Sequence, residues 1–83
     1  MQDKMKKLHW KCRRGMKEMD ILFEHYLYEH YENTDEAHQQ AFEQMCDMQD
    51  PTIADYLFER SRPDDEAVND IINIMRTYSV SRH

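Results

Sequence analysis

Residues 9–20 read HWKCRRGMKEMD, and the rest of the chain is organised around this stretch. It holds the only Trp and the only Gly of the 83 residues, and one of the two Cys. It also marks a change of charge. Through Lys17 the chain has seven basic side chains and one acidic one, a net +6, and from Glu18 onward it has four basic and sixteen acidic ones, a net −12. A small acidic body therefore carries one basic edge, with the single glycine at the boundary.

The composition around this stretch is that of a helical protein. One Gly and two Pro in 83 residues argue against a turn-rich sheet protein, and Glu, Lys, Gln, Met, Leu and Ala are good helix formers. Aromatic residues make up 11% of the chain, more than disordered segments usually carry. A chain this short forms one domain at most. We therefore expect residues 1–83 to be a single all-α domain, a compact bundle of five short helices.

The first two expected helices flank the glycine. A first helix at about 3–13 would carry Arg13 and Arg14 in its last turn, where cations suit the negative end of the helix dipole, and Gly15 would stop it in a left-handed conformation. A second helix at about 16–31 follows. Three tyrosines lie on it; Tyr26 is expected in the core, whereas Tyr28 and Tyr31 could be surface or interface residues, with packing the better interpretation for the group.

Three further helices are expected at about 35–48, 51–60 and 65–78, with a frayed tail at 79–83. Asn33 and Glu36 have the spacing of a capping box, and Asp50-Pro51 reads as an N-cap followed by a first-turn proline. Across the five helices, apolar residues at helical spacing are expected to face the core: Met5, Leu8, Cys12, Met16, Met19, Leu22, Phe23, Tyr26, Leu27, His30, Ala37, Ala41, Phe42, Met45, Met48, Ile53, Tyr56, Leu57, Val68, Ile71, Ile72, Met75 and Tyr78.

Several functional classes are disfavoured by the same pattern. No apolar run approaches the roughly 20 residues that span a bilayer, and no secretory or mitochondrial leader is visible, so a bacterial cytoplasm is the expected location. Two cysteines without a CxxC spacing are expected to stay reduced and buried or half-buried. The acidic bulk disfavours nucleic acid as the main partner.

Metal binding and catalysis find little support. His9 and Cys12 lie three residues apart, as do Asp35 and His38, but neither a di-iron set nor a four-ligand zinc set is present. Neighbouring arginines could activate the Cys12 thiol, yet no base and orienting residue accompany it. No phosphate-binding loop can be built with one glycine. We expect no metal site, no bound cofactor and no catalytic residue.

Arg14-Gly15-x-x-Glu18 admits two interpretations. In the first it is only a junction, in which Gly15 ends one helix and Glu18 favours the start of the next. In the second it is a docking surface, because Arg14 has further cations around it and an exposed glycine lets another backbone approach closely. Trp10 and Met16 flank it, and Arg and Trp are frequent binding hot spots.

The chain resembles the succinate dehydrogenase assembly (flavinylation) factors of the SdhE/YgfY type over nearly its whole length. The matching pieces are Trp10-x-x-Arg13-Arg14-Gly15-Met16-x-Glu18-x-Asp20, then Asp50-Pro51, Asp55-Tyr56-Leu57 and Pro63 before a final amphipathic helix. One departure is Tyr56, where many relatives carry Trp. An RGxxE pentapeptide alone would be weak, and the extended string, its position and the chain length make the resemblance specific.

The resemblance implies a helical bundle that is not an enzyme. It would bind the flavoprotein subunit of succinate dehydrogenase, or that of fumarate reductase, and promote covalent attachment of FAD, which belongs to the client. The residues that meet the client would be Arg14, Gly15 and Glu18, with Arg13, Met16 and Asp20 as close support and Trp10 beside them. We expect a monomer in the free state.

Two other functions remain open from the sequence. Members of the same family have been described as antitoxins that act on a membrane toxin or on cytoskeletal proteins, and the basic edge could serve that role. A small nucleic-acid adaptor using residues 4–17 is the weakest alternative, and it would bind with a strong salt dependence.

Overall fold

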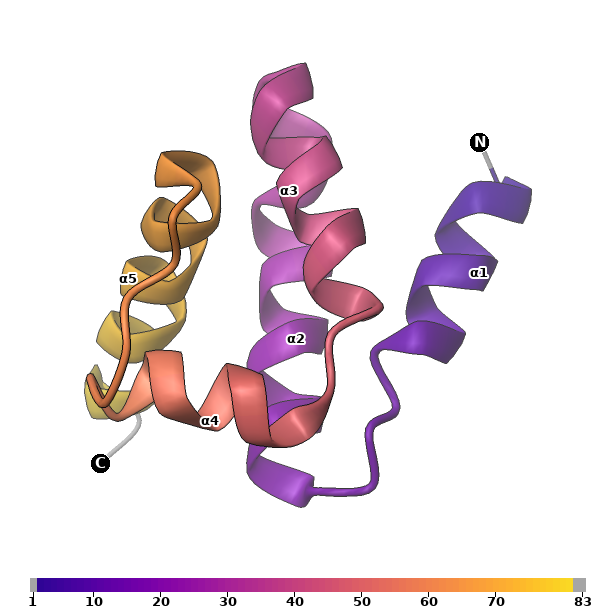
Figure 1. Cartoon of the computed structure of the whole chain (residues 1–83). Helices are drawn as coiled ribbons and strands as arrows, with labels where there is room; N and C mark the ends of the chain where they lie inside the picture. The colour runs from indigo at the N-terminus through magenta and orange to yellow at the C-terminus, as the bar shows by residue number, and fades with distance from the viewer. Residues whose placement is uncertain (1, 82–83) are drawn as a thin grey trace.

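The computed structural model describes residues 2–81, and all its regular structure is helical. In these residues there are five α-helices and one 3-10 helix and no strand (Figure 1): α1 (Gln2–Lys11), α2 (Lys17–Glu29), η1 (Tyr31–Asn33), α3 (Glu36–Cys46), α4 (Asp50–Leu57) and α5 (Glu66–Ser81). The prediction of an all-α fold of five short helices is confirmed.

The helices are arranged around a central pair. In Figure 1, α3 lies in front of α2 at the centre, with α5 on one side and α1 on the other, and α4 crosses the lower end of the bundle. The radius of gyration is 11.8 Å, the value expected for a folded chain of this length. The 12–16 segment, which connects α1 to α2, therefore reaches the same end of the bundle as the turn between α3 and α4.

The core is formed by the predicted helical stripes. Seventeen hydrophobic residues of the described part of the chain are buried, and most of them come from α2, α3 and α5. The rings of Phe23, Tyr26 and Tyr31 surround Phe42, with centroid distances of 5.8, 4.9 and 5.7 Å. Tyr31 is thus buried, not a surface residue, and its hydroxyl donates a 2.5 Å hydrogen bond to Glu43.

Two predicted core residues are exposed. Ala37 lies on the solvent side of α3, and Met16 precedes α2 as its N-cap residue, with half of its surface accessible. Met16 continues the apolar stripe of α2 by residue count only, because its backbone is extended (φ −110°, ψ 116°) and points the side chain off the helix.

The first helix ends earlier than its charge pattern indicates. The expected helix ran to residue 13, whereas α1 ends at Lys11. The amide of Arg13 donates to the carbonyl of Trp10, which tightens the last turn, and the amide of Arg14 leaves the helix altogether by donating to the Asp20 carboxylate. Arg13 and Arg14 therefore belong to the 12–16 segment.

Two of the predicted helix caps are wrong. Asn33 lies inside η1, and the N-cap of α3 is Asp35, whose carboxylate accepts from the His38 amide at 2.9 Å. Asp50 is the first residue of α4, behind an N-cap at Gln49 that makes no side-chain cap bond. Local spacing identified the right neighbourhoods but not the residue that closes each helix.

The remaining boundaries also shift. The α2 helix ends at Glu29 because the chain turns into η1, and α4 ends at Leu57, before the left-handed Glu59 (φ 60°). The α5 helix begins at Glu66 and continues to Ser81, so residues 79–81 of the expected frayed tail are helical. Residues 82 and 83 lie outside the described part of the chain.

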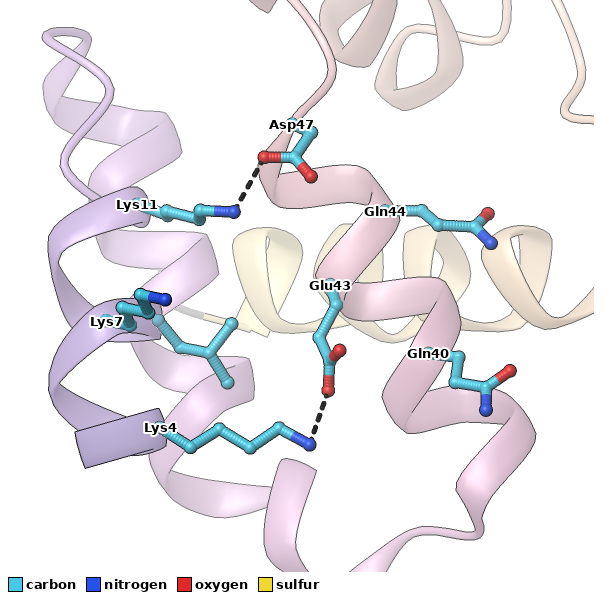
Figure 2. A pocket seen from close by; sticks show the side chains of 8 residues that line it. Lys4, Lys7, Lys11, Gln40, Glu43, Gln44 and Asp47 are labelled. Atoms are coloured by element: carbon cyan, nitrogen blue, oxygen red, sulfur yellow. Dashed lines mark hydrogen bonds and ion pairs between the residues drawn. The ribbon is translucent and has the colours of Figure 1, made fainter. Parts of the chain in front are cut away.

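The α1 helix is held on the bundle mainly along one line of residues. Leu8 and Cys12 are buried, and Met5 packs against the core edge. Two ion pairs reach from α1 to α3, Lys4–Glu43 at 3.0 Å and Lys11–Asp47 at 2.9 Å (Figure 2). Because both pairs are largely exposed, each contributes little to stability, and the buried side chains carry most of the attachment.

A histidine links the start of α3 to α5. The His38 ring contacts the Asp70 carboxylate at 3.0 Å and the Asp35 carboxylate at 2.5 Å. The hydrogen bond to Asp70 has the larger effect, and together with the one to Asp35 it raises the pKa of His38 above its usual 6.5. A histidine with a raised folded-state pKa stabilises the fold fully below 6.5, and this stabilisation is lost as pH rises through the folded-state pKa.

We predict that the pH dependence of stability changes when His38 is replaced. In His38→Gln, the loss of unfolding free energy between about pH 6.5 and the raised pKa of His38 should disappear, as measured by urea denaturation at a series of pH values. His25 is the internal control. Burial lowers the pKa of His25, so His25→Gln should change the slope in the opposite direction. Equal slopes in wild type and His38→Gln would contradict the prediction.

Candidate functional site

Arg14 points into the protein. Only 6% of its side chain is exposed, although it lies in a connecting segment with exposed residues on both sides. The guanidinium lies over the ring of Phe23 at 4.9 Å, so α2 covers one of its faces. A buried arginine is stable only where its charge and its donors are paired.

The donors of Arg14 are paired with the turn between α3 and α4. Its Nε donates to the Asp50 carboxylate at 2.7 Å, and its terminal nitrogens donate to the carbonyls of Cys46 at 3.1 Å, Met45 at 3.4 Å and Met48. The last carbonyls of a helix have no partner within the helix, and here a guanidinium supplies one for α3. Arg14 therefore fixes the 12–16 segment against the end of α3 and the start of α4.

The backbone of the same segment is fixed from the other side. The amide of Arg14 donates to the carboxylate of Asp20, in the first turn of α2, at 2.5 Å. The next residue, Gly15, has φ +88°, a conformation that glycine adopts without strain. A Cβ at Gly15 would meet nothing within 4 Å, so the space in front of this residue is open.

Exposed residues flank Gly15 in the chain, and we call the following set the docking edge: Trp10, Arg13, Gly15, Met16 and Glu18. Trp10 is 76% exposed and Met16 50% exposed, among the most exposed large apolar side chains of the described residues. Glu18 lies in the first turn of α2, where Ser79 of α5 donates to its carboxylate at 3.4 Å. The edge thus combines apolar, cationic and anionic groups around a bare backbone.

The predicted site residues divide into two groups. Trp10, Arg13, Gly15, Met16 and Glu18 are exposed, whereas Arg14 and Asp20 are partly buried and hold the 12–16 segment. Asp50, which pairs with Arg14, was interpreted from the sequence only as a helix cap. Nothing in the local pattern points to this pair, because its members are 36 residues apart.

The residues considered for metal binding or catalysis have other partners. His9 contacts the Tyr28 hydroxyl at 2.6 Å, and His38 joins two carboxylates. A hydrogen bond with Cys46 and burial raise the pKa of the Cys12 thiol far above its ordinary value, so the thiol is not poised for attack. Within residues 2–81, no three His, Cys, Asp or Glu side chains gather as a metal site would require, and no helix could cross a membrane.

We predict that Arg14 acts through the fold. Arg14→Ala leaves Asp50 and three carbonyls without their donor, so it should lower the unfolding free energy by about 3 kcal/mol in urea denaturation. Arg14→Lys keeps the charge but lacks the fork of donors, and it should recover less than half of that loss. Arg13→Ala is the matched control, since the Arg13 side chain is exposed, and its effect should stay within about 0.5 kcal/mol. An equally stable Arg14→Ala protein would show that Arg14 is not structural.

Comparison with known proteins agrees with the motif. The model of the Sdh5 family, described as the flavinator of succinate dehydrogenase, matches residues 6–79. A protein of Psychrobacter arcticus named FAD assembly factor SdhE is 35% identical over 80 residues, which cover 96% of this chain and 86% of that protein.

Two further relatives have the same name. The FAD assembly factor SdhE of Coxiella burnetii is 35% identical over 74 residues, covering 89% of this chain and 90% of the relative. That of Methylococcus capsulatus is 39% identical over 62 residues, 75% of each chain. Residues 6–79, which the family model matches, contain the docking edge and all of α2 to α4. The chain belongs to the SdhE-type family of succinate dehydrogenase flavinators.

Proposed function

We propose that this protein is an assembly factor that binds the flavoprotein subunit of succinate dehydrogenase and promotes covalent attachment of FAD to it. The family and the names of the relatives support the assembly role. The observation that carries the docking site is Gly15, which is exposed, left-handed and open in front of its Cα, on a segment held rigid by Arg14 and Asp20. The flavoprotein of fumarate reductase is a second client of the same chemistry.

The docking edge is suited to a partner that approaches closely. A glycine without neighbours within 4 Å of a Cβ position lets another chain reach the backbone of the 12–16 segment. Arg13 and Glu18 would then pair with polar groups of the client on either side, and Trp10 and Met16 would supply the apolar contacts. The fixed segment has little conformational entropy to lose on binding, which favours affinity.

The mechanism that fits these features is orientation of the client. Attachment of FAD needs a reactive flavin and a well-placed residue, both of which belong to the flavoprotein. A helper that binds only the productive arrangement of the client raises the population of that arrangement. Holding two reacting groups in place can supply a large part of a rate enhancement without new chemistry. In this mechanism the assembly factor is a non-enzymatic partner and holds no FAD of its own. We further propose that it is a monomer and acts in the bacterial cytoplasm.

We predict that a bulky side chain at Gly15 blocks flavinylation. Cells lacking the protein would be complemented with wild type, Gly15→Asn or Gly15→Arg, and flavin covalently bound to the denatured flavoprotein would be read by in-gel fluorescence. Gly15→Asn should keep most of the signal, because Asn tolerates a positive φ and is small. Gly15→Arg should lower the signal at least about tenfold, because its side chain fills the approach to the backbone.

The Asn variant separates docking from folding. Both replacements place a Cβ at φ +88°, which costs about 1 kcal/mol for Arg and less for Asn, and circular dichroism would verify that both variants keep the fold. Loss of signal in both variants at normal protein levels would place the requirement on backbone conformation, not on the approach of a client. Full flavinylation in cells without the protein would rule out this client and direct the search to fumarate reductase and to the antitoxin role.

A further inference from the structure

The lysines of α1 differ in what they contact. Lys4 and Lys11 are paired with carboxylates of α3, on the groove between the two helices that Figure 2 shows. Lys6 and Lys7 are exposed, and neither forms an ion pair with any side chain of residues 4–80. In Figure 2, Lys7 lies between the two ion pairs and joins neither. Two of the four positive charges of α1 are therefore neutralised by the protein itself, and two remain available.

The available charges lie beside Trp10. Lys6 and Lys7 precede Trp10 by four and three residues, so all three share one side of α1. Trp10 borders two shallow hollows, one of about 600 Å³ with Lys4, Lys6 and Lys7, and one of about 260 Å³ with Met5, Lys6, His9 and Tyr28. We call Lys6, Lys7, Trp10 and Tyr28 the α1 face, in which Lys6 and Trp10 line both hollows, Lys7 only the first and Tyr28 only the second.

The second hollow has a fixed wall. The Tyr28 hydroxyl is hydrogen-bonded to Nδ1 of His9 at 2.6 Å, and the two rings lie 5.9 Å apart. Tyr28 is nevertheless 57% exposed, so its ring presents apolar surface next to the Trp10 indole. The exposed rings of Trp10 and Tyr28, with Lys6 beside them, form a surface that accepts an apolar side chain flanked by negative charge.

The net negative charge of the rest of the molecule disfavours binding of such a ligand elsewhere. Residues from Glu18 onward carry a net charge of −12, whereas residues through Lys17 carry +6. A negatively charged segment is therefore steered toward α1, at a rate that falls with ionic strength. A nucleic acid, which presents a long row of phosphates, would meet the acidic body on both sides of the narrow α1 face.

We propose that the α1 face binds an acidic segment of the client flavoprotein, in which an apolar or aromatic residue sits against Trp10 and Tyr28 and neighbouring carboxylates pair with Lys6 and Lys7. The identity of the client rests on the proposed function, and the chemistry of the segment rests on α1 alone. This contact shares Trp10 with the docking edge, continues from it along α1 away from Gly15, and would give the complex a second point of attachment.

The first test uses an isolated probe. Trp10 is the only tryptophan, so its emission reports this face without a label. A short peptide of glutamates around a central Phe-Leu pair should shift the emission at low salt, and the same peptide with lysine in place of glutamate should not. Lys6→Glu/Lys7→Glu should weaken binding of the acidic peptide at least about tenfold.

A matched pair of charge reversals controls for net charge. Arg60→Glu/Arg62→Glu changes the net charge equally on the far loop before α5, where the Arg60–Asp55 pair is exposed and contributes little. This control should bind the peptide within about twofold of wild type. An unchanged Trp10 emission with the acidic peptide, equal binding by the Lys6/Lys7 variant, or binding of RNA or anionic vesicles in place of the peptide would overturn the proposal.

The second test uses the purified flavoprotein subunit. Lys6→Glu/Lys7→Glu should lower the association rate and its salt dependence, whereas Gly15→Arg should abolish the complex and leave peptide binding unchanged. If wild type does not bind the flavoprotein, the proposed function fails, and the peptide experiment still decides the chemistry of the α1 face. If wild type binds and the lysine variant binds equally well at low salt, the α1 face is not part of the complex.

Discussion

The contact on which the rest of this structure depends is the pairing of the Arg14 guanidinium with Asp50 and the end of α3. Burying a cation is costly unless its charge is paired, and here one guanidinium donates hydrogen bonds to a carboxylate and to three carbonyls. The segment between α1 and α2 contributes few apolar residues, so packing alone would not hold it. Arg14 replaces that missing packing with a polar anchor between segments 36 residues apart.

The same solution occurs a second time. Arg76 of α5 donates to the carbonyls of Leu57 at 3.1 Å and Tyr56 at 2.8 Å, at the end of α4. Short helices have a large share of unpaired terminal carbonyls, and many proteins close them with glycine caps. A chain with a single glycine cannot do this repeatedly. Arginines from distant segments, Arg14 and Arg76, close these ends, which leaves Gly15 available at the surface.

The sequence predicted the fold well because the fold is encoded locally. The apolar residues of α2, α3 and α5 recur at helical spacing, and most of them are buried. The RGxxE string also led to the family, since its residues are close together in the chain. The sequence did not predict the contacts between segments that are distant in the chain. The local pattern places Arg14 at the surface, because its partner Asp50 is 36 residues away in the sequence. It does not decide whether Tyr31 is buried, because Glu43, which accepts a hydrogen bond from the Tyr31 hydroxyl, lies on the next helix.

The modest attachment of α1 has a consequence for the lifetime of the free protein. Leu8, Cys12 and two exposed ion pairs hold this helix, so it can separate from the bundle at a lower free energy than global unfolding requires. An opened α1 is a lysine-rich segment accessible to proteases, and its departure uncovers the two cysteines. A partner that covers α1 suppresses this opening by mass action. We therefore expect the amount of this protein in a cell to follow the amount of its client, because the unbound molecules are degraded first.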